Sequence, residues 1–222
     1  MTEFDYKDFL QSHLIDVDGY QALSYPKDLA DFIKLDGNEN PYGPSDNVIK
    51  ALAQVDDLQL YPNSTDRLKQ KIAQSLDVLA ENIVCGAGAD AVINLIFSSL
   101  KKDMVITTIT PTFGMYKFDA FMNNLAFIEI DFGEISEDSD TVYQFDLPST
   151  PQAQDVFIFA NPNNPTGQVV NRESILRLLE QGCLVIIDEA YIKFSNSKSF
   201  INLTKEYDNL IVIQTFSKWA GL

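Results

Sequence analysis

Short apolar runs recur along the chain from residue 82 onward, and each ends in residues that form turns. Segments with helical patterning separate most of these runs, at 91–100 and at 173–180; Asn171 is the expected N-cap of the second helix, and Gly182 follows its end. Strands that are apolar on both faces and alternate with helices are typical of a mainly parallel sheet sandwiched by helices. We therefore predict an α/β fold. The five runs are NIVCGAGAD, MVITTITPTF, VFIFANPNNPTG, CLVIIDEAY and NLIVIQTFSK.

The chain before residue 82 is patterned differently. Residues 1–35 are mixed and irregular, and the stretch GNENPYGP at 37–44 is dense in turn formers. Between Asp66 and Ala80, leucines and an isoleucine recur at spacings of four, four and three residues, which predicts an amphipathic helix. We expect an N-terminal arm and loop at 1–44, followed by one large domain at 45–222.

Composition and charge limit the partners of this domain. The 222 residues carry a formal net charge of −16. Such a charge disfavours nucleic acid and anionic membrane surfaces, because both are bound through Lys and Arg. Most of the acidic residues are expected on a solvated face, and 132–140 reads as an acidic surface loop. A phosphorylated ligand would therefore need a local cluster of donors.

Several site classes lack support in the sequence. Cys85 and Cys183 adjoin apolar runs without metal-ligand spacing, so we expect buried thiols in a reducing compartment and no metal site. His13 is the only histidine and is expected to be solvated. The N-terminus lacks a signal-peptide pattern, and no apolar run approaches the roughly 20 residues of a membrane span. We expect a soluble, cytoplasmic protein without membrane contact.

The residues at the strand ends are the candidates for chemistry, because ligands gather at the carboxyl ends of parallel strands. The stretch GAGADA at 86–91 matches a dinucleotide-binding pattern, but the next strand ends in 107–110 without the acid that such a site needs. Its glycines and its position at a helix start would equally suit a phosphate. A tight turn with no ligand is the remaining alternative.

The other strand ends carry further polar groups. The stretch NPNNPTG at 161–167 is a rigid turn that holds three amides. Asp188 follows an apolar run, where a helix N-cap is the simplest role for it, and Tyr191 lies three residues on. Lys218 follows the last apolar run beside two hydroxyls. Together these residues supply the groups that pyridoxal 5′-phosphate requires: an amine that can form an imine, a carboxylate, a phenol, an amide and a phosphate-binding turn.

The sequence resembles a known family, the fold-type I pyridoxal-phosphate-dependent aminotransferases, and most closely their histidinol-phosphate aminotransferase subgroup. The resemblance runs in order from about residue 35 to the end, and the last four motifs as an ordered set are highly specific. The motifs are LDGNENPYGP (35–44), LYPNS (60–64), GAGAD (86–90), PTFGMY (111–116), NPNNPTG (161–167), DEAYIKF (188–194) and TFSK (215–218).

The resemblance implies a role for each matching residue. Lys218 is implied as the catalytic lysine that links to the cofactor aldehyde and moves protons, and Asp188 as the partner of the pyridine nitrogen. The ring oxygen would be held by Asn164 and Tyr191. The backbone of Ala89 and Asp90, together with Thr215 and Ser217, is implied to hold the phosphate, and Phe113 to stack on the ring. Tyr61 is implied to reach the phosphate of a neighbouring subunit in a homodimer, and Asn38 and Asn40 to lie near the substrate entrance.

The resemblance also implies an activity. It is amino transfer between histidinol phosphate and 2-oxoglutarate in histidine biosynthesis, with aromatic amino acids as further candidate donors. Two alternatives stay open: a threonine-phosphate decarboxylase-like lyase using the same cofactor site, and a non-catalytic truncated fragment. In the family the chain continues past Leu222 into a small C-terminal domain, so we expect that domain to be missing here. The side chain of Tyr116 could face either the substrate or the core.

Overall fold

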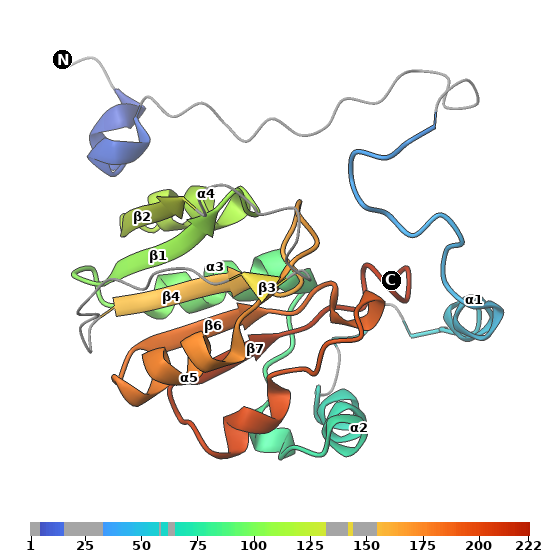
Figure 1. Cartoon of the computed structure of the whole chain (residues 1–222). Helices are drawn as coiled ribbons and strands as arrows, with labels where there is room; N and C mark the ends of the chain where they lie inside the picture. The colour runs from blue at the N-terminus through green and yellow to red at the C-terminus, as the bar shows by residue number, and fades with distance from the viewer. Residues whose placement is uncertain (1–4, 16–32, 58, 62–64, 132–141, 144–154) are drawn as a thin grey trace.

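A five-stranded parallel sheet lies at the centre of the computed structural model (Figure 1). The strand order is β2-β1-β4-β6-β7, and all four pairings are parallel. The predicted α/β fold is therefore confirmed. The strands are β1 (Val105–Thr110), β2 (Ala126–Asp131), β4 (Asp155–Ala160), β6 (Leu184–Asp188) and β7 (Leu210–Ile213). The structure describes residues 5–15, 33–57, 59–61, 65–131, 142–143 and 155–222.

Helices cover both faces of the sheet, as the apolar strands require. Alternate side chains of β4 point to opposite faces, so Phe157 and Phe159 belong to one core and Val156 and Ile158 to the other. Helix α5 (Arg172–Glu180) closes the first core, while α3 (Gly88–Ser99) and α4 (Met115–Met122) close the second. The two helical layers leave the carboxyl edge of the sheet available for a site.

The order of the strands creates a crevice at that edge. The chain passes from β1 outward to β2, but β4 lies on the other side of β1, and β6 and β7 continue in that direction. Loops that leave β1 and β4 therefore diverge. A parallel sheet binds its ligands at such a switch point.

Shorter elements complete the described part of the chain. Asn171 caps α5 as predicted, since its side chain accepts hydrogen bonds from the backbone N–H groups of Glu173 and Ser174 at 2.8 and 3.1 Å. Gly182 follows α5 with a φ of +82°. The other elements are α1 (Asp46–Leu52), α2 (Asp66–Leu76), β3 (Val142–Tyr143), β5 (Val169–Val170) and the 3₁₀ helices Tyr6–Phe9, Ser12–Leu14, Ala80–Asn82, Ile192–Phe194 and Ile201–Lys205.

Three expectations need correction. The helix predicted from Asp66 ends at Leu76, because Asp77 adopts a left-handed conformation with a φ of 55°. The apolar run from residue 82 forms no strand: residues 83–87 have no pairing partner within the described chain, and Val84 is exposed. His13 is not simply solvated, because its ring packs edge-on against Phe121 with its Nε2 buried.

Three further expectations concerned the two cysteines, the acidic loop and membrane-spanning helices. Cys183 is buried in the core, whereas Cys85 is half-buried. The predicted acidic loop at 132–140 lies outside the described residues. Within the described ranges, no helix has both the length and the apolar character needed to cross a bilayer.

Candidate active site

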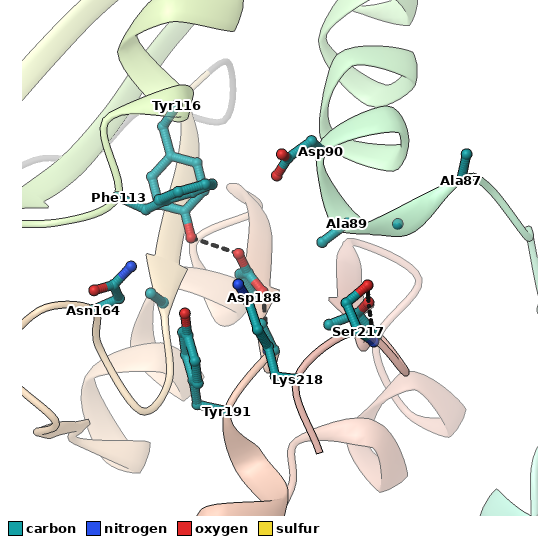
Figure 2. A pocket seen from close by; sticks show the side chains of 14 residues that line it. Ala87, Ala89, Asp90, Phe113, Tyr116, Asn164, Asp188, Tyr191, Ser217 and Lys218 are labelled. Carbon is teal, nitrogen blue, oxygen red and sulfur yellow. Dashed lines mark hydrogen bonds between the residues drawn. The ribbon is translucent and has the colours of Figure 1, made fainter. Parts of the chain in front are cut away.

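A cavity of about 240 Å³ opens at the carboxyl edge of the sheet, between the start of α3 and the loops after β1, β4, β6 and β7 (Figure 2). All the residues predicted to contact the cofactor line this cavity, except Tyr61. The lining residues are Ala87, Gly88, Ala89, Asp90, Phe113, Tyr116, Ala160, Asn164, Asp188, Ala190, Tyr191, Thr215, Ser217 and Lys218.

Asp188 forms the floor of the cavity at the end of β6. Its carboxylate accepts hydrogen bonds from the Tyr116 hydroxyl at 2.7 Å and from the Ala190 backbone N–H at 3.0 Å. Burial raises the pKa of Asp188, and the hydrogen bond from Tyr116 opposes that rise. A buried carboxylate of this kind is stabilised by a cation placed against it. Asp188 is not the helix N-cap that was expected, because the next helix, Ile192–Phe194, has Tyr191 at its N-cap.

The sequence left open whether the side chain of Tyr116 faces the substrate or the core. Its ring is fully buried in the core under α4, yet its hydroxyl points at Asp188 (Figure 2). The ring of Phe113 meets it edge-on, with centroids 5.6 Å apart. The pKa of Tyr116 is raised well above its usual value by burial and by the adjacent carboxylate, so the hydroxyl keeps its proton and acts as a donor.

Lys218 and Tyr191 occupy the opposite wall. The Lys218 Nζ donates to the Gly37 carbonyl at 3.1 Å and lies 6.0 Å from the centroid of the Tyr191 ring. The hydroxyl of Tyr191 and the amide of Asn164 point into the same space (Figure 2). An amine and a carboxylate from adjacent strands thus face one cavity with room between them.

The three asparagines of the turn after β4 have separate tasks. The Asn161 side chain accepts from the Val170 N–H at 3.0 Å. The Asn163 amide donates to the Pro111 carbonyl and accepts from the Thr112 hydroxyl, at 2.9 and 2.8 Å. These two amides tie the turn to β5 and to the loop after β1. Asn164 is the asparagine of this turn that lines the cavity.

The far end of the cavity is suited to an anion. Helix α3 begins without a side-chain cap, and although the Gly88 N–H bonds to the Gly86 carbonyl at 3.0 Å, the N–H groups of Ala89 and Asp90 that follow are available there. Thr215 and Ser217 add two hydroxyls, whose oxygens lie 3.0 Å apart. Gly88 has a φ of +82°, and a Cβ built on it would come 4.0 Å from the Ser217 Oγ, which shows how closely the helix start approaches that loop.

The N-terminal arm also reaches the site. The Asn38 side chain donates to the Tyr191 hydroxyl at 3.1 Å, and that of Asn40 donates to the Trp219 carbonyl at 3.2 Å. Tyr61 does not line the cavity; its side chain is 95% exposed. Its predicted contact would be made with another subunit and stays a prediction.

Glu189 is a structural residue of the site that the sequence reasoning did not single out. Its side chain is buried and accepts from the Ser199 hydroxyl, the Phe200 N–H and the Gln214 amide, at 2.6, 2.7 and 2.8 Å. It therefore connects the end of β6 to the segments that follow β6 and β7. The sequence does indicate this role, because a second acidic residue directly after an apolar strand must also find hydrogen-bond donors.

The residues present fit pyridoxal phosphate. The buried carboxylate of Asp188 suits a protonated ring nitrogen, Phe113 offers an aromatic face, and the uncapped start of α3 with its neighbouring hydroxyls suits a phosphate. The Lys218 amine faces the same cavity. Each group of the cofactor thus has a partner of matching chemistry.

Comparison with known protein families is consistent with the geometry of this site. The family model for aminotransferase class I and II matches residues 30–222. A histidinol-phosphate aminotransferase from Dehalococcoides mccartyi is 35% identical over 99% of this chain. The chain belongs to the class I and II aminotransferase family. It spans 62% of the length of that relative.

Solved structures share the fold. A histidinol-phosphate aminotransferase from Sinorhizobium meliloti, solved in complex with pyridoxal-5′-phosphate, has a TM-score of 0.69 and 20% identity, covering 84% of this chain and 52% of that one. An L-threonine-O-3-phosphate decarboxylase from Porphyromonas gingivalis has a TM-score of 0.68 and 22% identity, covering 83% and 55%. At these identities the likeness concerns the fold alone.

Proposed function

We propose that the protein is a pyridoxal-phosphate-dependent aminotransferase that exchanges an amino group between histidinol phosphate and 2-oxoglutarate in histidine biosynthesis. The observation that carries this proposal is the placement of Lys218, Asp188 and the start of α3 around one cavity. The choice of substrate is supported by the 35% sequence identity with a histidinol-phosphate aminotransferase over 99% of this chain. Histidinol phosphate is an amino-alcohol phosphate, and 2-oxoglutarate is a 2-oxo acid.

The chemistry divides between the cofactor and the chain. When bound, pyridoxal phosphate supplies an aldehyde that condenses with amines and a ring that withdraws electrons from the substrate's Cα. Lys218 provides the amine that holds the cofactor and carries the proton to and from that Cα. Asp188 keeps the ring nitrogen protonated. Asn164 and Tyr191 would donate to the ring oxygen, and Phe113 would pack against the ring.

The anion end anchors this arrangement. Thr215, Ser217 and the N–H groups at Ala89 and Asp90 would hold the phosphate of the cofactor. Asn38 and Asn40 lie on the side where substrate enters. We place this machinery in the large domain at 45–222, with residues 1–44 as the arm.

We further propose a cytoplasmic homodimer in which Tyr61 contacts the phosphate bound by the partner. The exposure of Tyr61, and of Tyr42 at 94%, supports a surface that is covered by another copy. The site would then be shared between two chains.

Transamination is distinguished from decarboxylation by the products of the complete protein. Incubation with histidinol phosphate and 2-oxoglutarate should yield glutamate without CO₂. Release of CO₂ from O-phosphothreonine, without glutamate formation from either substrate, would replace the aminotransferase with the decarboxylase. Absence of both products, together with tight cofactor binding, would favour a non-catalytic protein that only binds the cofactor.

A further inference from the structure

The loop at residues 37–40 lies directly against the two chemically active side chains of the cavity wall. The Gly37 carbonyl accepts from the Lys218 Nζ, and the Asn38 amide donates to the Tyr191 hydroxyl, each at 3.1 Å. Asn40 adds a bond to the backbone of Trp219. Three successive contacts therefore join segments more than 150 residues apart in the chain.

Local structure holds this loop in place. The Nζ of Lys34 forms ion pairs with Asp36 at 3.1 Å and with Glu39 at 2.6 Å, which link the two sides of the loop. At its other end, Gly221 packs so closely on Gly43 that an added Cβ would lie 2.8 Å from the Gly43 carbonyl carbon. The position of the Asn38 amide is thus set by contacts on both sides.

Asn38 itself has a conformation that few residues adopt. Its φ is 48°, in the left-handed region, which asparagine tolerates better than most side chains. This backbone places the amide against Tyr191 at the exposed rim of the cavity. Aspartate and glycine are the replacements that keep such a backbone without added strain.

The direction of this hydrogen bond determines what Tyr191 can do. An amide NH₂ group only donates, so the Tyr191 oxygen is the acceptor, and its single hydrogen must be directed elsewhere. The hydroxyl points into the cavity (Figure 2). We propose that Asn38 is a positioning residue that fixes Tyr191 as a hydrogen-bond donor toward the ring oxygen of bound pyridoxal phosphate. This inference rests on the proposed function.

The consequence is measurable in the absorbance of the bound cofactor. A hydrogen bond donated to the ring oxygen makes that oxygen less basic. It therefore lowers the pH midpoint of the visible band, which reports the proton held between the oxygen and the linked Lys218 nitrogen. Asn38→Asp keeps the size and backbone preference of the side chain but can only accept, so Tyr191 would turn its hydrogen away from the cofactor.

The experiment is a double-mutant cycle on the complete, cofactor-loaded protein, read by absorbance titration. Asn38→Asp should raise the midpoint by roughly half to one pH unit, as expected for one hydrogen bond together with the added charge. Tyr191→Phe should also raise it. In the Tyr191→Phe background, Asn38→Asp should produce a clearly smaller rise, because only the added charge remains to act.

Three outcomes overturn the inference. If Asn38→Asp shifts the midpoint equally in both backgrounds, the effect is electrostatic, and Asn38 does not orient Tyr191. Asn38→Gly provides a second variant, in which the hydroxyl rotates freely; its midpoint should fall between those of wild type and Asn38→Asp, and a wild-type midpoint would also contradict the inference. If the wild-type protein has no visible band that borohydride abolishes, the proposed function itself fails, and the inference with it.

Discussion

The Tyr116 hydroxyl donates a 2.7 Å hydrogen bond to Oδ2 of Asp188, and both side chains are buried. This bond joins the helix after β1 to the end of β6, across the point where the strand order reverses. It gives an isolated carboxylate one of its two donors, the other being the Ala190 N–H. Tyr116 thereby supports the ionised form of Asp188 that a protonated ring nitrogen requires.

Removal of this donor should make stability depend more strongly on pH. Burial raises the pKa of Asp188 and the Tyr116 bond lowers it, so Tyr116→Phe should raise it further. A raised carboxyl pKa favours the folded state below the unfolded value of 3.8, and that contribution is lost as pH rises through the folded value. Cofactor-free Tyr116→Phe should therefore be destabilised by about 1–3 kcal/mol near neutral pH.

The measurement is urea unfolding of both proteins at neutral pH and at about pH 4, where the carboxyl gains its proton and the difference should shrink. An equal loss of stability at both pH values would mean that Tyr116 contributes packing and not a hydrogen bond to a charge.

Asp188→Asn should weaken cofactor binding. The amide has the same shape but no charge, so the pair with the ring nitrogen is lost. Loss of one partner of a buried charge pair costs about 2–5 kcal/mol, which corresponds to a roughly 30-fold or greater increase in Kd for pyridoxal phosphate.

Asp119→Asn is the matched control for that variant. Asp119 is also buried and accepts a hydrogen bond from Asn94 at 3.1 Å, but it does not line the cavity. Its Kd, measured by fluorescence titration, should stay within about twofold of wild type, a range typical of sites without ligand contact. Equal losses in the two variants would remove Asp188 from the cofactor site.

The phosphate end can be tested with a ligand that lacks the phosphate. Ser217→Ala removes a hydroxyl beside the start of α3, and a hydrogen bond to a charged group is worth about 1.5–3 kcal/mol. Affinity for pyridoxal phosphate should fall by roughly tenfold or more, while affinity for pyridoxal stays unchanged. Ser98→Ala, at the other end of α3, should change neither. A parallel loss for both ligands would place the phosphate elsewhere.

Sharing of the site between subunits predicts complementation. Tyr61→Ala and Lys218→Ala should each be inactive or strongly impaired as homodimers. Mixed dimers would contain one site with both residues intact, so refolding an equal mixture should restore roughly a quarter of wild-type activity. If the mixture shows only the sum of the separate activities, Tyr61 does not act across an interface.

The parallel sheet could be predicted from the sequence because it depends on local patterns, whereas the individual cofactor contacts were implied by the family resemblance and stay predictions. Apolar runs that end in Asp188 and Lys218 bring those residues to one edge, whatever the rest of the chain does. The orientation of Tyr116 could not be predicted, since a helical tyrosine can turn its ring to the core and still present its hydroxyl elsewhere. The failed strand at 83–87 has a similar cause: an extended apolar run becomes a strand only where a neighbouring strand pairs with it.

The central claim is that the Lys218 amine bonds covalently to the aldehyde of pyridoxal phosphate. The direct measurement is borohydride reduction of the cofactor-loaded complete protein, followed by proteolysis and mass spectrometry. The account predicts one modified peptide that carries the reduced cofactor on Lys218, and its loss in Lys218→Ala. A cofactor found on another lysine, or an unmodified Lys218 peptide from fully loaded protein, would contradict the account.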